Sequence, residues 1–157
     1  MDMNFLNEIL QSAHKALHST ESAILKVQDD VMRALDTKKG VVLVLLDLSA
    51  AFDTVDHYIL IERLQSRLGI KGKALEWFRN YLSERLQSVS INGTVSKIWE
   101  LLVGVPQGSV LGHILFTIYT LPLGDILRKH NMGYHLYADD TQIYLTCDSD
   151  NLAGCIS

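Results

Sequence analysis

The chain begins with hydrophobic residues at helical spacing and then changes to a strand-like run. Apolar residues recur every three or four positions over Phe5–Leu17 and again over Ala23–Leu35, where Ser19-Thr20 supplies residues that favour a helix N-terminus. The continuous apolar run Val41–Leu46 then ends at Asp47. Such runs are typical of strands covered on both faces. The pattern therefore predicts two helices followed by a strand buried on both faces.

The rest of the chain mixes helices and strands without regular alternation. Asn92-Gly93 lies between two short strand-like segments, which is a strong signal for a β-hairpin. A second pair of strands, with a three-residue connection, is expected over Gly133–Tyr137 and Thr141–Thr146. Helices are expected over Tyr58–Leu68, Lys73–Leu82 and about Ser109–Leu121, the last with Pro122 near its end. This mixture predicts the α+β class.

Composition limits the class of protein and the cellular compartment that we expect. With 157 residues, 48% hydrophobic and a net charge of -4, the chain is expected to form one globular domain. The negative charge does not favour nucleic-acid binding, because phosphate affinity comes mainly from Lys and Arg; such binding would require a local basic patch or basic regions that these residues do not include. No apolar run approaches a membrane span and no signal peptide is evident, so we expect no membrane role. Two cysteines are too few for a disulfide framework, which indicates an intracellular protein, nuclear or cytoplasmic.

Acidic residues stand at two strand ends. Tyr137-Ala138-Asp139-Asp140 reads as the turn of the second hairpin, and Asp47 ends the apolar strand. If these strands are neighbours, three carboxylates meet at one sheet edge, where they and the Leu48 carbonyl would suit two Mg²⁺ ions, with Mn²⁺ as a substitute. The alternative is a polar hairpin tip, with Asp47 serving only as a cap.

A glycine-flanked loop, Gly104–Ser109, leads into the third predicted helix. Glycine lets the backbone approach a ligand closely, and the Gln107 side chain can both donate and accept hydrogen bonds without charge. A helix N-terminus also favours phosphate. As structure alone, the same segment is a turn followed by a helix cap.

Three segments together resemble the successive palm motifs of a reverse transcriptase, in the order found in that family: Leu46–His57, Gly104–Gly112 and Tyr137–Gln142. The resemblance is closest to the non-LTR retrotransposon type, the long interspersed elements, and covers about Gln11 to Thr146. One departure is His113, where the family usually has proline.

The resemblance implies a right-hand polymerase palm with part of the fingers. It implies an antiparallel sheet with helices packed on one face, and no thumb. The whole chain, 1–157, would be one partial reverse transcriptase domain. Residues up to about 40 would be fingers-like helices, and about 41–157 would be palm, with motifs at 46–57, 104–112 and 137–142.

The resemblance also implies residue roles. Asp47, Asp139 and Asp140, with the Leu48 carbonyl, would be the catalytic metal ligands. Phe52 would be a steric gate that clashes with a ribose 2′-hydroxyl, although an aromatic core role is the alternative. The remaining matched positions would contact nucleotide, template or primer end: Gln107, Gly108, Tyr137 and Ala138. His57 is expected to have a hydrogen-bonded structural role.

The implied activity is RNA-directed DNA polymerisation, in which deoxynucleoside triphosphates are added to a primer 3′-hydroxyl on an RNA template. A DNA primer would be the second nucleic-acid partner, and a protein partner or further domains would supply the thumb. The acidic charge and the length leave an alternative open. In that alternative the chain is a catalytically silent remnant of a retroelement that binds protein or nucleic acid.

Overall fold

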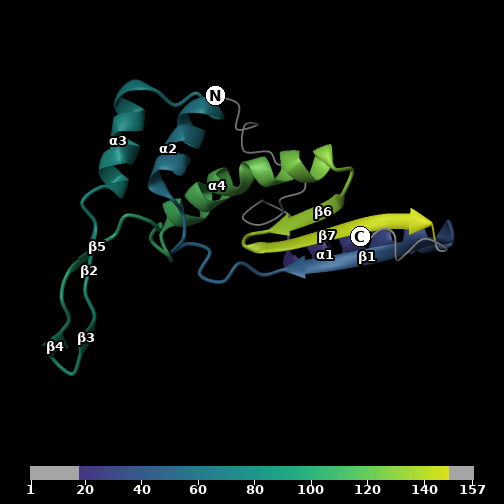
Figure 1. Cartoon of the computed structure of the whole chain (residues 1–157), viewed down its shortest axis with the longest axis horizontal. Helices are drawn as coiled ribbons and strands as arrows, with labels where there is room; N and C mark the ends of the chain where they lie inside the picture. The colour runs from purple at the N-terminus through teal and green to yellow at the C-terminus, as the bar shows by residue number, and fades with distance from the viewer. Residues whose placement is uncertain (1–17, 149–157) are drawn as a thin grey trace. The chain divides into compact units, whose positions relative to one another are not determined.

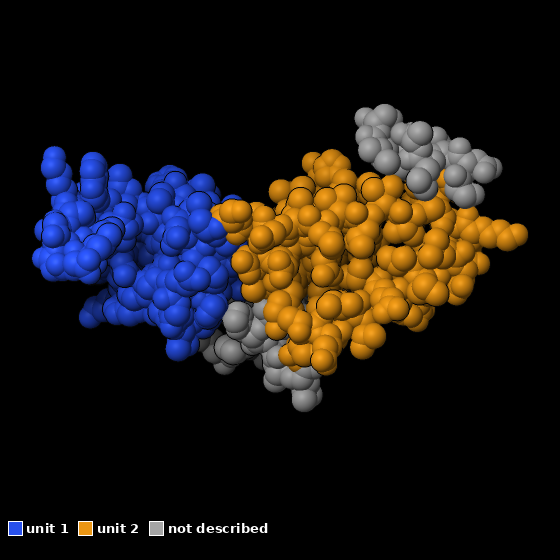
Figure 2. Space-filling model, turned by 90° about the horizontal axis from the view of Figure 1, so that it is seen from below, with its two compact units in different colours: residues 1–5, 50–119 blue, residues 6–49, 120–157 orange. Residues whose placement is uncertain are grey.

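The computed structural model describes residues 18–148, which divide into two compact units (Figure 2). One comprises residues 50–119 and is called the helical unit here. The other comprises residues 18–49 together with 120–148 and is called the sheet unit. Each is described by itself.

The sheet unit is built on a three-stranded antiparallel sheet in the order β1-β7-β6 (Figure 1). These strands are β1 (Lys39–Leu46), β6 (Gly133–Tyr137) and β7 (Asp140–Asp148). The β1–β7 ladder runs from Lys39 opposite Asp148 to Leu46 opposite Thr141. The antiparallel sheet and the second hairpin are thus confirmed.

Helices contact both faces of this sheet. Leu127 of α4 (Val110–Lys129) forms a buried cluster with Tyr134 and Leu136 of β6, and Ile143 packs against it. Tyr144, the next residue of β7, donates a hydrogen bond from its hydroxyl to Asp30 of α1 (Thr20–Asp36). Successive strand residues point to opposite faces, so α4 and α1 contact opposite faces. The prediction of helices on one face is wrong, because both faces of the hairpin carry large side chains that need cover.

The first predicted strand also differs in its burial. Leu43, Val44, Leu45 and Leu46 are all exposed, with Leu45 at 68%. Within residues 18–148, β1 pairs with β7 alone and is therefore an edge strand. The prediction of burial on both faces is wrong, because a continuous apolar run records hydrophobicity but not the number of neighbours.

Helix α1 begins where the sequence predicts. Ser19 is its N-cap, and Ser19 and Ser22 exchange side-chain to backbone hydrogen bonds in a capping box. The helix expected over Phe5–Leu17 lies outside the described residues.

The helical unit contains α2 (His57–Ser66), α3 (Gly72–Leu82) and the first half of α4. A two-stranded ribbon extends from α3 (Figure 1) and contains β2 (Leu86–Gln87), β3 (Ser90–Ile91), β4 (Thr94–Val95) and β5 (Trp99–Glu100). The ribbon turns at Asn92-Gly93, where both residues have positive φ. Both predicted helices and the Asn-Gly hairpin are confirmed, with shorter strands than expected.

Helix α4 is longer than predicted, because it continues through Pro122 to Lys129. Proline inside a helix removes one backbone hydrogen bond and costs about 3 kcal/mol. Packing of Leu123 and Leu127 in the sheet unit offsets this cost. By length and composition α4 could cross a membrane, contrary to our expectation that no segment reaches that length. The same test is passed by core helices, and Leu115, Phe116, Ile118 and Leu127 are buried inside the protein.

Candidate active site

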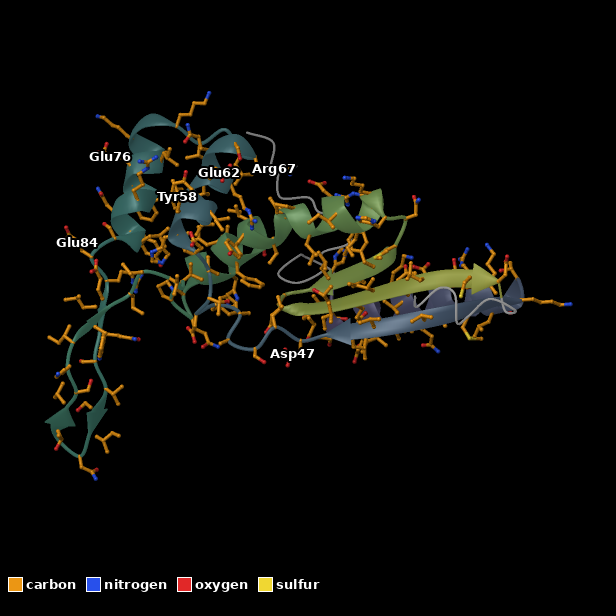
Figure 3. All side chains as sticks on the ribbon, in the orientation of Figure 1. Asp47, Tyr58, Glu62, Arg67, Glu76 and Glu84 are labelled. Carbon is orange, nitrogen blue, oxygen red and sulfur yellow. The ribbon has the colours of Figure 1, made fainter. Side chains whose placement is uncertain are left out.

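The strand register places two of the predicted carboxylates at the same end of one ladder. Leu46 pairs with Thr141, so Asp47 and Asp140 are the next residues beyond that pair on their two strands. Asp47 lies just past the end of β1 (Figure 3) and is exposed, as is Asp140. Asp139 stands in the adjoining hairpin turn and is half-buried. The sheet unit therefore brings these backbones to one corner, as the strand-end argument predicts.

The acidic hairpin turn is tight. Tyr137 pairs with Asp140, so only Ala138 and Asp139 form the loop. Ala138 has φ 54, a left-handed value that favours glycine. A non-glycine residue held there stores strain of order 1–3 kcal/mol, and such strain is often found at functional sites. The turn thus holds two carboxylates on a backbone with little freedom.

The donor set of this corner suits Mg²⁺ chemically. Carboxylates of Asp47, Asp139 and Asp140 and the carbonyl of the exposed Leu48 are all hard oxygen ligands. Among residues 18–148, however, no three His, Cys, Asp or Glu side chains are grouped closely enough to hold a metal ion. The register brings the candidate ligands to one corner, while their carboxylates do not converge.

In the helical unit, the segments that follow Asp47 and precede Pro106 are joined by backbone hydrogen bonds. Gly104 N donates to Val55 O at 2.7 Å, and Val105 N donates to Phe52 O at 2.8 Å. His57 Nε2 lies 2.7 Å from Gly104 O, which agrees with the expected structural role of this histidine. Val55 and Val105 are both buried. Backbone hydrogen bonds thus hold together two segments that are about fifty residues apart in sequence.

Gly104 makes this junction possible. It has φ +95, and a Cβ added there would lie 3.1 Å from the Asp53 carbonyl oxygen. The sequence indicates only general backbone freedom for this glycine, and its contact with the first motif was not predicted. Positive φ and close backbone approach are both reasons for glycine, and its position next to Val105-Pro106 was the available signal.

Phe52 is half-buried within the helical unit. Its ring meets His113 edge-on, with centroids 5.2 Å apart, and lies 5.0 Å from the ring of Phe116. His113, the position where the family usually has proline, therefore packs beside the proposed gate. Both interpretations of Phe52 retain support, because its ring contacts two other rings and the residue remains partly exposed.

The Gln107 loop presents its functional candidates to solvent. Gln107 and Gly108 are exposed, and Gly108 has φ +79. The Ser109 hydroxyl accepts from Gly112 N at 2.9 Å and so caps the start of α4. Gly112 must be small, because an added Cβ would lie 2.4 Å from the Pro106 carbonyl oxygen. The loop is therefore fixed at its helix end and open at Gln107.

The predicted site residues are divided between the two units. Asp47, Leu48, Tyr137, Ala138, Asp139 and Asp140 lie in the sheet unit, whereas Phe52, Gln107 and Gly108 lie in the helical unit. The helical unit also has a pocket of about 390 Å³ whose lining includes Tyr58 and Glu62 of α2 and Arg79 of α3. Figure 3 labels Tyr58 and Glu62. None of the predicted site residues lines the pocket.

Comparisons with known proteins give a consistent result. A family model described as reverse transcriptase (RNA-dependent DNA polymerase) matches residues 1–156. The probable RNA-directed DNA polymerase from transposon X-element of Drosophila melanogaster is 30% identical over 148 residues, which are 92% of this chain and 16% of that protein. The RNA-directed DNA polymerase from mobile element jockey of the same species is 30% identical over 139 residues, 85% of this chain and 15% of that protein.

A solved structure agrees at the level of the fold. Telomerase from Candida albicans, in complex with a fragment of telomeric RNA, superimposes with a TM-score of 0.65 at 13% identity. The match covers 94% of this chain and 28% of that one. This chain spans about a sixth of the length of the curated relatives. The chain belongs to the reverse transcriptase family, and its relatives are polymerases of non-LTR retrotransposons.

Proposed function

We propose that the chain carries part of the catalytic core of an RNA-directed DNA polymerase, which adds deoxynucleotides to a primer 3′-hydroxyl by two-metal phosphoryl transfer. The observation that carries this proposal is the β1–β7 register, in which Leu46 pairs with Thr141 and the acidic residues Asp47 and Asp140 follow at the same end. Family membership supports the same chemistry. RNA template, DNA primer and deoxynucleoside triphosphates would be the substrates and partners.

Asp47, Asp139 and Asp140 would hold the metal ions, together with the Leu48 carbonyl. When bound, the ions would lower the pKa of the primer hydroxyl and stabilise charge on the leaving oxygens. The carboxylates are ligands in this scheme and do not act as bases. The strained, two-residue turn at Ala138-Asp139 would limit the freedom of two of these ligands, and preorganisation of this kind lowers the cost of assembling the site.

The remaining residues would position the substrates. Phe52 would stand against the sugar of the incoming nucleotide, with its ring supported by His113 and Phe116. Gln107 would contact the nucleotide or template from an open loop whose base is fixed by Ser109. Tyr137 and Ala138 would lie near the primer end. The hydrogen bonds at Gly104 and Val105 would keep the two helical-unit loops in one arrangement.

Primer extension tests the proposal. The 157-residue chain is supplied with an RNA homopolymer template, a complementary DNA primer, deoxynucleotide and Mg²⁺ or Mn²⁺. We expect template-dependent addition, and Asp139→Asn should reduce its rate by about 1,000-fold, equivalent to about 4 kcal/mol of transition-state stabilisation. The matched control is Asp148→Asn, an exposed aspartate at the other end of β7, which should retain the wild-type rate.

A binding measurement separates metal capture from turnover. Titration with Mn²⁺, followed by the electron paramagnetic resonance signal of free Mn²⁺, should show weaker binding in Asp47→Asn and Asp140→Asn than in Asp148→Asn. Full polymerase activity in Asp139→Asn would contradict the proposal. A folded wild-type chain that neither binds Mn²⁺ nor extends a primer would instead support the silent, binding-only alternative.

A further inference from the structure

Helix α3 and the residues just after it carry basic and aromatic side chains at four-residue spacing. We call Lys73, Trp77, Tyr81 and Arg85 the α3 ladder. Trp77 and Tyr81 are stacked, with ring centroids 5.4 Å apart and planes 14° from parallel. The Arg85 guanidinium carbon lies 5.6 Å from the Tyr81 centroid. The ladder therefore continues an aromatic stack into a cation–π contact.

The Trp77 indole is held in place and yet open to solvent. Phe78 meets it edge-on at a centroid distance of 5.1 Å, while Tyr81 stacks on it. Even so, Trp77 is 51% exposed. A flat ring that is already oriented loses little conformational entropy when a second ring stacks on it. Trp77 is thus suited to bind a planar ligand.

The sequence segment that contains α3 is rich in basic residues. Residues 63–85 contain six Lys and Arg against two acidic residues, Glu76 and Glu84, although the whole chain has a net charge of -4. Both acidic residues are on or next to α3 (Figure 3). This segment is net positive, and its Lys73 and Arg85 stand four residues before Trp77 and four residues after Tyr81, where they can contact phosphates on either side of a stacked base.

We propose that the α3 ladder binds single-stranded RNA, with a base stacked on Trp77 and backbone phosphates contacted by Lys73 and Arg85. A stacking surface between cations fits single strands because every base has a π-face. The choice of RNA rests on the proposed function, in which a single-stranded template enters the protein. A protein partner is the competing occupant. Binding of a protein at Trp77 in place of RNA would contradict the proposal.

Tryptophan fluorescence provides the test, because the chain contains only Trp77 and Trp99. Trp99→Phe leaves Trp77 as the sole emitter. This variant is titrated with a short oligouridine at low salt in the presence of EDTA. We expect quenching of Trp77 emission, which added salt should reverse.

Variants then identify the contacts by fluorescence anisotropy with a labelled oligouridine. Trp77→Ala should weaken binding about tenfold, within the range of base–aromatic stacking, and Trp77→Phe should weaken it less. Replacing Lys73 and Arg85 together with Gln should reduce the slope of log affinity against log salt by about 1.4. Tyr58→Ala is the matched control, because Tyr58 is an exposed aromatic on α2, 80% accessible and outside the ladder.

The outcomes also distinguish this inference from the proposed function. EDTA removes any contribution from metal, and Asp139→Asn should bind oligouridine as tightly as wild type. Loss of primer extension with RNA binding intact would therefore count against the proposed function only. Unquenched Trp77, wild-type affinity in Trp77→Ala, or quenching by a protein partner but not by oligouridine would overturn the inference.

Discussion

The two β-hairpins within residues 18–148 close with two-residue turns but use different residues to do so. The ribbon hairpin turns at Asn92 (φ 49) and Gly93 (φ 82), two residues that accept left-handed backbone readily. The acidic hairpin turns at Ala138 (φ 54) and Asp139, and alanine does not favour that conformation. The turn of the first hairpin consists of residues that favour its backbone conformation. The second accepts strain at the position where the proposed metal ligands stand.

The strands that flank these two turns differ in how deeply their side chains are buried. Ile91 and Val95 beside the ribbon turn are 67% and 60% exposed, whereas Tyr134 and Leu136 leading to the acidic turn are 2% and 3% exposed. Packing of β6 and β7 on both faces provides the free energy that a strained turn requires. A hairpin can therefore be stabilised in two ways. The ribbon has a favourable turn and weak packing, whereas the acidic hairpin has an unfavourable turn and strong packing.

Of the substitutions that test this comparison of the two hairpins, Gly133→Ala in β6 should change the stability of the protein most. A Cβ there would lie 2.1 Å from the Tyr144 ring, so the ring or the strand must move. We expect a loss of about 2–3 kcal/mol in the free energy of unfolding, as for other overpacked cores. Urea denaturation followed by circular dichroism measures it.

Gly69→Ala is a useful control for crowding, since nothing lies within 4 Å of a Cβ at Gly69 although its φ is +65. Gly69→Ala should lower the free energy of unfolding by about 1 kcal/mol, because alanine does not favour the left-handed backbone conformation. If Gly133→Ala costs no more than Gly69→Ala, packing of Tyr144 over Gly133 does not support the acidic hairpin.

Tyr144→Phe should produce the next largest effect. Its hydroxyl bonds Asp30, and burial together with the Asp30 carboxylate raises the pKa of Tyr144 far above its ordinary value of 10.0. Burial acts to raise the pKa of Asp30, but hydrogen bonds from Lys26 and Tyr144 hold it below its usual 3.8. A hydrogen bond to a charged group that is only partly buried should be worth about 1–2 kcal/mol.

The pH dependence of this loss follows from the two shifts. The Tyr144 contribution is complete below pH 10 and disappears as the pH rises through its raised pKa, while the Asp30 contribution is complete above pH 4 and disappears as the pH falls through its lowered pKa. The stability difference between wild type and Tyr144→Phe should therefore be greatest between about pH 4 and pH 10. A difference that is constant from pH 3 to pH 11 would exclude this bond as its cause.

Sequence reasoning located the elements of both hairpins because their signals are local. Asn92-Gly93 is a turn signal in itself, and Tyr137-Ala138-Asp139-Asp140 stands between two short apolar segments that read as strands. Prediction failed where the result depends on distant neighbours. The exposure of Leu45 depends on how many strands flank β1, and the continuation of α4 through Pro122 depends on packing of Leu127 against Tyr134.

The candidate site shows the same division. The strand-end positions of Asp47 and Asp140 could be inferred from hydrophobic runs alone, and their common corner follows from the β1–β7 pairing. The hydrogen bonds that join Gly104 to Val55, and the stack of Trp77 on Tyr81, involve geometry that no local pattern specifies. The α3 ladder was thus not predicted, although its four-residue spacing is visible in the sequence.

The smallest effect tests strain in the acidic turn directly. Ala138→Gly should stabilise the protein by about 1 kcal/mol, because glycine relieves the left-handed backbone at a cost in unfolded-state entropy that is smaller than the relief. Gly93→Ala, at φ +82 with open space around its Cβ, should destabilise by a similar amount. Both free energies come from matched urea titrations. Opposite signs would establish that one hairpin tolerates strain and the other avoids it, whereas destabilisation by both substitutions would mean that the Ala138 methyl contributes packing that outweighs its backbone cost.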